Sequence, residues 1–145
     1  MPTNTGLLTF VPLSAKLTGL PEDKKKHMRA IVIEPTMDDF TPAPKFVEID
    51  GSLKSFQGLV GGYIEAVRTN IAGCDAYIND EGKLNGLPLN ILASHICPLT
   101  HGDYIVGTMV LVGPPDNNGD ETDVDEGVME DLLAIRYMQN VARNA

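Results

Sequence analysis

The stretch YIVGTMVLV, residues 104–112, is the most hydrophobic part of the sequence. Its apolar, β-branched character and its length favour a strand that is buried on both faces, and Pro114-Pro115 ends it. Gly107 interrupts the run, which indicates either a bulge or the close approach of another backbone. We therefore predict that residues 104–112 form the central strand of a sheet.

Four segments that precede this stretch have the patterns of further strands. Residues 28–33 (MRAIVI) form a β-branched run that ends at Glu34-Pro35, and residues 46–50 (FVEID) alternate apolar and polar side chains. Residues 63–67 alternate in the same way, and residues 76–78 follow after a turn. The first two segments are expected to pair as antiparallel neighbours.

Two short helices are predicted between these strands. The first begins after Ser52, a capping residue, and ends at Gly61-Gly62; its apolar residues at helical spacing are Leu53, Phe56, Leu59 and Val60. The second begins near Pro88, because proline fits the first turn of a helix. Its apolar face is expected to consist of Leu89, Leu92, Ala93 and Ile96.

A third, longer helix is predicted near the C-terminus. Asp123 and Glu126 have the spacing of a capping box, and one amphipathic face follows, made of Val124, Val128, Leu132, Ile135 and Met138.

The order of these elements indicates an α+β domain with a single mixed or antiparallel sheet of about five strands. Its start, two strands, a helix and two strands, is β-grasp-like, and an amphipathic helix ends it. We predict three parts: an N-terminal arm at 1–26, a compact α+β domain at 27–113, and an acidic linker with the C-terminal helix at 114–145.

The chain is acidic, with a formal net charge of -9, and this charge is unevenly distributed. Residues 1–26 carry +2, residues 27–113 carry -5 and residues 114–145 carry -6. Direct nucleic-acid binding is not expected, because it depends on lysine and arginine. No apolar run approaches the roughly 18 residues of a membrane span and no secretory signal is evident, so a cytoplasmic protein without a membrane partner is expected.

The cysteines and histidines suggest neither a metal site nor a cofactor site. Cys74 and Cys97 match no disulfide framework or zinc pattern, and they are predicted to be free thiols. The acidic run at 116–123 places its glycine too early for a calcium loop. Ser94, His95, Cys97 and His101 lack the setting of a catalytic nucleophile, so a small hydrolase that uses His95 or His101 is the weaker alternative.

The polar stretch NDEGKLNGLPLN, residues 79–90, is the strongest candidate for a binding site. It carries more hydrogen-bonding variety than a turn requires. The proposed ligand-binding residues are Asn79, Glu81, Lys83, Asn85 and Asn90. The alternative is that its asparagines cap turns and helix ends.

Four blocks together resemble a known family: RAIVIEP within 28–35, EIDGSLKSFQGLVGGYIEAV at 48–67, NDEGKLNGLPLN at 79–90 and DYIVGT at 103–108. This is an uncharacterised domain-of-unknown-function family of small proteins encoded by bacteriophages and by mobile elements of bacteria. The resemblance covers about residues 28–113, and the acidic helix lies outside it.

The resemblance implies an accessory protein that meets host machinery, for example to counter host defence. We expect it to be non-catalytic and to bind a small polar ligand, with a nucleotide-like molecule among the options, or a host protein. The alternative is an acidic interaction protein or DNA mimic that blocks a basic host partner. A homo-oligomer is also compatible with the sequence, formed through the arm or an uncovered face of the sheet.

Overall fold

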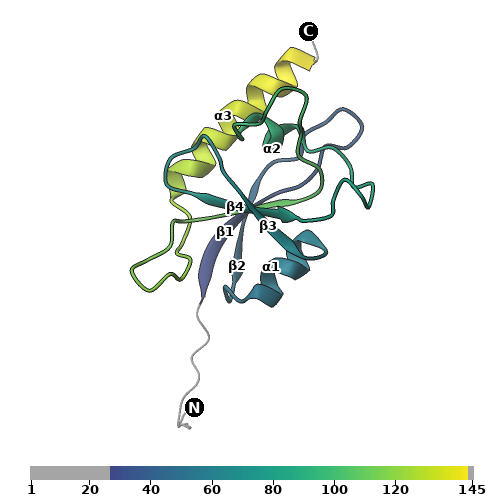
Figure 1. Cartoon of the computed structure of the whole chain (residues 1–145). Coiled ribbons are helices and arrows are strands. Elements are labelled where there is room, and N and C mark those ends of the chain that lie inside the picture. The colour runs from purple at the N-terminus through teal and green to yellow at the C-terminus, as the bar shows by residue number, and fades with distance from the viewer. Residues whose placement is uncertain (1–26, 144–145) are drawn as a thin grey trace, which may run out of the picture.

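The computed structural model describes residues 27–143, and the predicted arm at 1–26 lies outside this range. The elements within it are β1 (Met28–Ile33), β2 (Lys45–Ile49), α1 (Leu53–Val60), β3 (Ile64–Val67), β4 (Asp75–Asn79), α2 (Ile91–His95), β5 (Met109–Val112) and α3 (Glu126–Arg143). The predicted α+β class is confirmed (Figure 1).

The five strands form one antiparallel sheet in the order β2-β1-β5-β4-β3. The hydrophobic segment is central as predicted, since β5 pairs with β1 on one side and with β4 on the other. In the chain, α1 lies between the two hairpins β1-β2 and β3-β4, which is the predicted β-grasp-like start. In the sheet, β5 lies between these two hairpins.

Helices cover both faces of the sheet (Figure 1). Alternate strand residues such as Ile31 and Leu111 pack with α2 and the first half of α3, whereas Val32 and Val110 pack with α1. Because side chains alternate across a strand, these two sets form separate apolar layers. The sheet therefore offers no broad uncovered face to a second copy.

The central strand begins later than the sequence pattern suggested. Residues 104–107 run beside residues 88–90, with the Gly107 N–H bonded to the Pro88 carbonyl at 2.7 Å and a bridge between Leu89 and Val106. Gly107 has a φ of 76°, and a Cβ there would lie 2.8 Å from Leu87 Cδ1. The group that comes close to Gly107 is the side chain of Leu87, whereas the prediction offered a bulge or another backbone, and regular pairing resumes only at Met109.

The same bridge corrects the predicted start of α2. Pro88 is not in the first turn, because Leu89 is held in extended conformation by Val106 and the helix begins at Ile91. Asn90 is the N-cap, and its side chain accepts a hydrogen bond from the Ala93 N–H. In α1, by contrast, the predicted Ser52 cap and the end at Gly61 are both confirmed.

The predicted capping box of α3 is also wrong. The Asp123 carboxylate accepts a hydrogen bond from the backbone N–H of Arg29 at 2.8 Å, and Asp125 caps the helix by accepting from the Gly127 N–H at 2.9 Å. The apolar face is largely as predicted, since Val128 and Leu132 are buried, but Met138 is exposed.

Cys74 and Cys97 are both buried and form no disulfide, as predicted. Burial raises the pKa of the Cys74 thiol, and it raises the pKa of Cys97 to about 11.

Because the thiolate is the reactive form, we expect both thiols of the folded protein to react with Ellman's reagent at least about tenfold more slowly than after unfolding in urea. An Ala72→Cys variant supplies an exposed thiol as a control, and a rapidly reacting thiol in the folded wild type would contradict this prediction.

Candidate functional site

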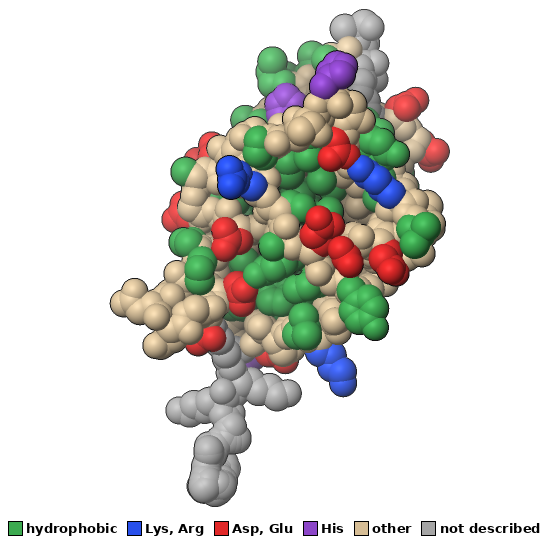
Figure 2. Space-filling model, viewed as in Figure 1, with side chains coloured by type: hydrophobic (Ala, Val, Ile, Leu, Met, Phe, Trp, Pro, Cys, Tyr) green, Lys and Arg blue, Asp and Glu red, His purple; other side chains and the backbone are tan. Residues whose placement is uncertain are grey.

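A cleft of about 290 Å³ opens between the turn that follows β4 and the segment 103–106. Its lining residues are Glu65, Val67, Ile78, Asn79, Asp80, Glu81, Gly82, Lys83, Leu84, Leu99, Asp103, Tyr104, Ile105 and Val106. Figure 2 shows apolar side chains, in green, on the floor of a hollow near the centre of the view, with acidic and basic side chains at its rim.

The first wall of the cleft is shaped by Asn79, which is only 5% exposed at the end of β4. Its side-chain oxygen accepts a hydrogen bond from the Glu81 N–H at 2.8 Å, and its amide donates to the Val60 carbonyl at 3.2 Å. The turn is thereby tied to the end of α1. Gly82 packs closely against Val106, since a Cβ at position 82 would lie 2.9 Å from a methyl group of Val106. The two walls of the cleft meet at this point.

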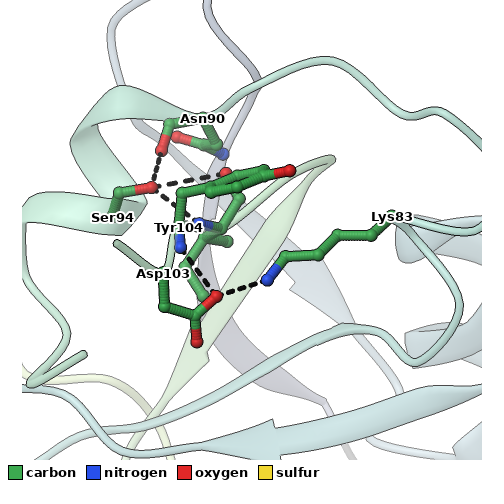
Figure 3. Close-up of polar contacts among 6 residues, drawn as sticks. Lys83, Asn90, Ser94, Asp103 and Tyr104 are labelled. Carbon is green, nitrogen blue, oxygen red and sulfur yellow. Dashed lines mark hydrogen bonds and ion pairs between the residues drawn. The ribbon is translucent and has the colours of Figure 1, made fainter. Parts of the chain in front are cut away.

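The second wall is held in place by Ser94 of α2 (Figure 3). Its hydroxyl donates to the Asn90 carbonyl and accepts from the Ile105 N–H, each at 2.8 Å. Asp103 accepts a hydrogen bond from the Tyr104 N–H at 2.8 Å, which fixes the preceding turn. This network places the side chains of Asp103 and Tyr104 at the rim of the cleft.

An ion pair between Lys83 and Asp103 joins the two walls (Figure 3). The Lys83 ammonium also lies 4.5 Å from the centre of the Tyr104 ring, in cation–π contact. The hydrogen bond to Asp103 raises the pKa of Lys83 and, in turn, lowers the pKa of Asp103. The carboxylate of Asp103 and the ring of Tyr104 thus form a binding position for a cation, and the ammonium group of Lys83 occupies it.

The rim of the cleft carries more negative than positive charge. Four carboxylates, Glu65, Asp80, Glu81 and Asp103, face one ammonium, so the lining has a formal charge of -3. Within residues 27–143, Glu65, Asp80 and Glu81 form no ion pair within 4 Å. Below them the floor is apolar, with Val67, Ile78, Leu99, Ile105 and Val106.

Three of the predicted ligand-binding residues lie at this cleft: Asn79, Glu81 and Lys83. Asn85 lines a separate hollow of about 300 Å³ on the α1 side of the turn, together with Gln57 and Tyr63. Asn90 is fully buried away from both. Its amide donates to the carbonyls of Ile33 and Gly107, and its oxygen caps α2, so it has a structural role.

Sequence reasoning did not assign Glu65, Asp103 and Tyr104 to the site. Asp103 and Tyr104 lie about twenty positions after Lys83 in the sequence, where the predicted strand begins at Tyr104. The signal for these two residues in the sequence is the DYIVGT block at 103–108, which contains both of them.

The candidate catalytic residues are not assembled into a triad or a metal site. The Ser94 hydroxyl is engaged with backbone groups on both sides, and His95 and His101 are exposed. Among residues 27–143 no group of three or more histidine, cysteine, aspartate or glutamate side chains is placed to hold a metal ion. None of the helices in this range combines the length and apolar character needed to cross a membrane.

Comparisons with known proteins identify the family and no relative of known activity. No curated protein and no solved structure matches the chain. The family described as "Domain of unknown function (DUF3846)" matches residues 28–139, which includes most of α3 and therefore extends beyond the resemblance seen at 28–113. The chain belongs to the DUF3846 family, a domain of unknown function.

Proposed function

We propose that this protein is a non-catalytic, phage-type accessory protein that binds a small polar ligand in the cleft between the β4 turn and residues 103–106. The ligand class that fits best is an amino or guanidinium group on a short apolar stem. The observation that carries this proposal is the excess of three negative charges around an apolar floor. Sequestering such a molecule, or the basic side chain of a host protein, is a means of countering host defence.

A cationic head group is favoured by the electrostatics of the rim. A charge pair at about 4 Å contributes about 1 kcal/mol in water and about 4 kcal/mol at a partly shielded protein surface. Glu65, Asp80 and Glu81 are available for such pairs. A phosphate would instead face the four carboxylates of the lining, so a nucleotide-like ligand ranks below an amine.

The Lys83–Asp103 ion pair indicates how the ligand enters. Both side chains are about half exposed, and ion pairs at such positions contribute little to stability because water screens them. A ligand cation therefore displaces the Lys83 ammonium from Asp103 and Tyr104 at little cost. On this mechanism Lys83 competes with the ligand, whereas Asp103 contacts it.

Calorimetric titration with agmatine, which carries both an ammonium and a guanidinium group, tests this proposal. Asp103→Asn is expected to weaken agmatine binding about tenfold, the equivalent of about 1.4 kcal/mol. Lys83→Ala is expected to leave binding intact or to tighten it a few-fold, because the internal competitor is gone. Glu48→Gln, an exposed substitution on β2 outside the cleft, is the matched control and should have no effect.

An anionic ligand reverses these results. If wild-type protein binds AMP in such a titration, and Lys83→Ala weakens this binding while Asp103→Asn strengthens it, the ligand belongs to the nucleotide-like class and not to the cationic class. Absence of agmatine binding in folded wild-type protein would contradict the amine class directly.

The second candidate function is an acidic interaction protein or DNA mimic. It is favoured by the exposed acids at the start of α3, Glu126, Glu130 and Asp131. Because Val128 and Leu132 of this helix are buried in the core, the test neutralises the exposed acids and leaves the helix in place. Capture of a basic host protein that survives the triple neutral variant, or that is insensitive to salt, would exclude this function.

A further inference from the structure

The hollow of about 300 Å³ on the α1 side of the β4 turn is lined by four side chains that can form hydrogen bonds. Gln57 lies in the last turn of α1, Tyr63 precedes β3, and Glu81 and Asn85 belong to the turn itself. Within residues 27–143, none of these four side chains forms a hydrogen bond or an ion pair. Their donors and acceptors are therefore available to a ligand.

Backbone hydrogen bonds hold these side chains in a fixed arrangement. The Tyr63 carbonyl accepts from the Asp80 N–H at 2.8 Å, and the Glu81 carbonyl accepts from the Asn85 N–H at 2.9 Å. The side-chain oxygen of Asn79, which also lines the hollow, accepts from the Glu81 N–H at 2.8 Å. The segment before β3 and the turn after β4 are thus tied together. A ligand that binds between them does not have to order the backbone first.

The charge of this hollow favours an uncharged ligand. Of the described residues that line it, only Glu81 is charged. Gly61, the C-cap of α1, also lines it, and the C-terminal end of a helix adds partial negative charge. An anion is therefore disfavoured. A cation has a stronger site on the other side of the turn, where four carboxylates line the cleft.

We propose that this hollow binds one sugar ring, a neutral ligand with several hydroxyl groups. Carboxamide and phenol groups both donate and accept hydrogen bonds, whereas a carboxylate only accepts. A hydroxyl group also does both, so a ring of hydroxyls matches Gln57, Asn85 and Glu81 together. The apolar C–H face of the sugar packs on the ring of Tyr63, which is 70% exposed. A volume of about 300 Å³ is at the lower end for small-molecule sites, which suits a single ring.

A nucleobase fits this hollow less well than a sugar. Bound bases are commonly stacked between two aromatic or apolar side chains, but Tyr63 is the only aromatic residue among the described residues that line the hollow. The phosphate of a nucleotide would also approach Glu81. The supply of carboxamides around a single exposed ring is better matched by hydroxyl groups.

Saturation-transfer NMR of the full chain with the methyl glycosides of glucose, galactose and mannose tests this site. At least one glycoside is expected to bind, with the strongest transfer at the C–H protons of its ring. Tyr63→Ala is expected to weaken binding about tenfold, because the aromatic contact is lost, whereas Tyr63→Phe should retain it. The double variant Gln57→Ala/Asn85→Ala should also weaken binding about tenfold, since two side chains lose their hydrogen bonds to the ligand.

Tyr137→Ala is the matched control, because Tyr137 is 65% exposed on α3 and does not line the hollow. It should bind the glycoside as wild type does. Absence of transfer to all three glycosides overturns the proposal, and so does unchanged binding in Tyr63→Ala or in the double variant. Binding of adenine but of no glycoside, lost in Tyr63→Ala, would assign the hollow to a nucleobase instead. The glycosides carry no charge, so these outcomes are independent of the agmatine titration that tests the cleft.

Discussion

Replacing Asn90 with alanine is expected to lower the free energy of unfolding by about 3 to 5 kcal/mol, because each buried polar group left unpaired costs about 1 to 3 kcal/mol. The side chain is fully buried. It donates to the carbonyls of Ile33 at 3.0 Å and Gly107 at 2.8 Å, and it accepts from the Ala93 N–H at 3.0 Å. One amide thus joins the end of β1, the kink before β5 and the start of α2.

Urea unfolding measures this effect, with a lower midpoint at an unchanged slope. Asn85→Ala is the matched control, since Asn85 is exposed and should change stability by less than about 0.5 kcal/mol. Asn90→Asp separates the two roles of the side chain: it keeps the helix cap but turns an oxygen toward two carbonyls. If Asn90→Asp were as stable as the wild type, only the helix cap would contribute to stability, and the hydrogen bonds from the amide to the carbonyls of Ile33 and Gly107 would not.

The elements with strong local patterns were predictable from sequence. The β-branched run of β1, the Ser52 and Gly61 limits of α1 and the position of β5 at the centre of the sheet all follow from local pattern and hydrophobicity. Such signals depend on residues that are close in the chain. They do not depend on which segments meet in space.

The errors arose where a distant segment overrides a local preference. Pro88 is a good first-turn residue, but the bridge between Leu89 and Val106 keeps that segment extended. Asp123 has the sequence spacing of a capping box, but its carboxylate instead accepts a hydrogen bond from the backbone N–H of Arg29 at the start of β1. In both cases the competing partner is a backbone group whose position only the sheet topology determines.

The same limit explains how much of the candidate site was foreseen. Asn79, Glu81 and Lys83 belong to one polar stretch, and they line the cleft. Glu65 and Tyr104 come from other parts of the chain, and their contribution depends on the β3-β4 pairing and on the bond between Ser94 and Ile105. Asn90 resembled the other asparagines in the sequence, and only its burial shows that it supports the second wall from behind.

Replacing Gly113 with alanine is expected to destabilise the fold by about 3 kcal/mol, at the upper end of the usual cost of overpacking. A Cβ at this position would lie 2.2 Å from the Asp123 carbonyl oxygen and 2.4 Å from the Thr122 hydroxyl oxygen. The Gly113 N–H also donates to the Thr122 carbonyl at 2.8 Å. Because the obstructing oxygen belongs to the backbone, no change of rotamer relieves the contact.

The strain at Gly113 reaches the segment that anchors α3 to the sheet. Asp123 and Val124 bond to Arg29 of β1 through backbone and side-chain groups, so moving them to make room for a methyl group loosens that attachment. Gly58→Ala is the matched control with the opposite sign: no heavy atom lies within 4 Å of its Cβ position, and alanine in a helix interior is favoured over glycine by about 0.5 to 1 kcal/mol. Thermal melts of the two variants should therefore shift in opposite directions. Equal shifts would mean that the contact between residues 113 and 122–123 does not hold the start of α3 in place.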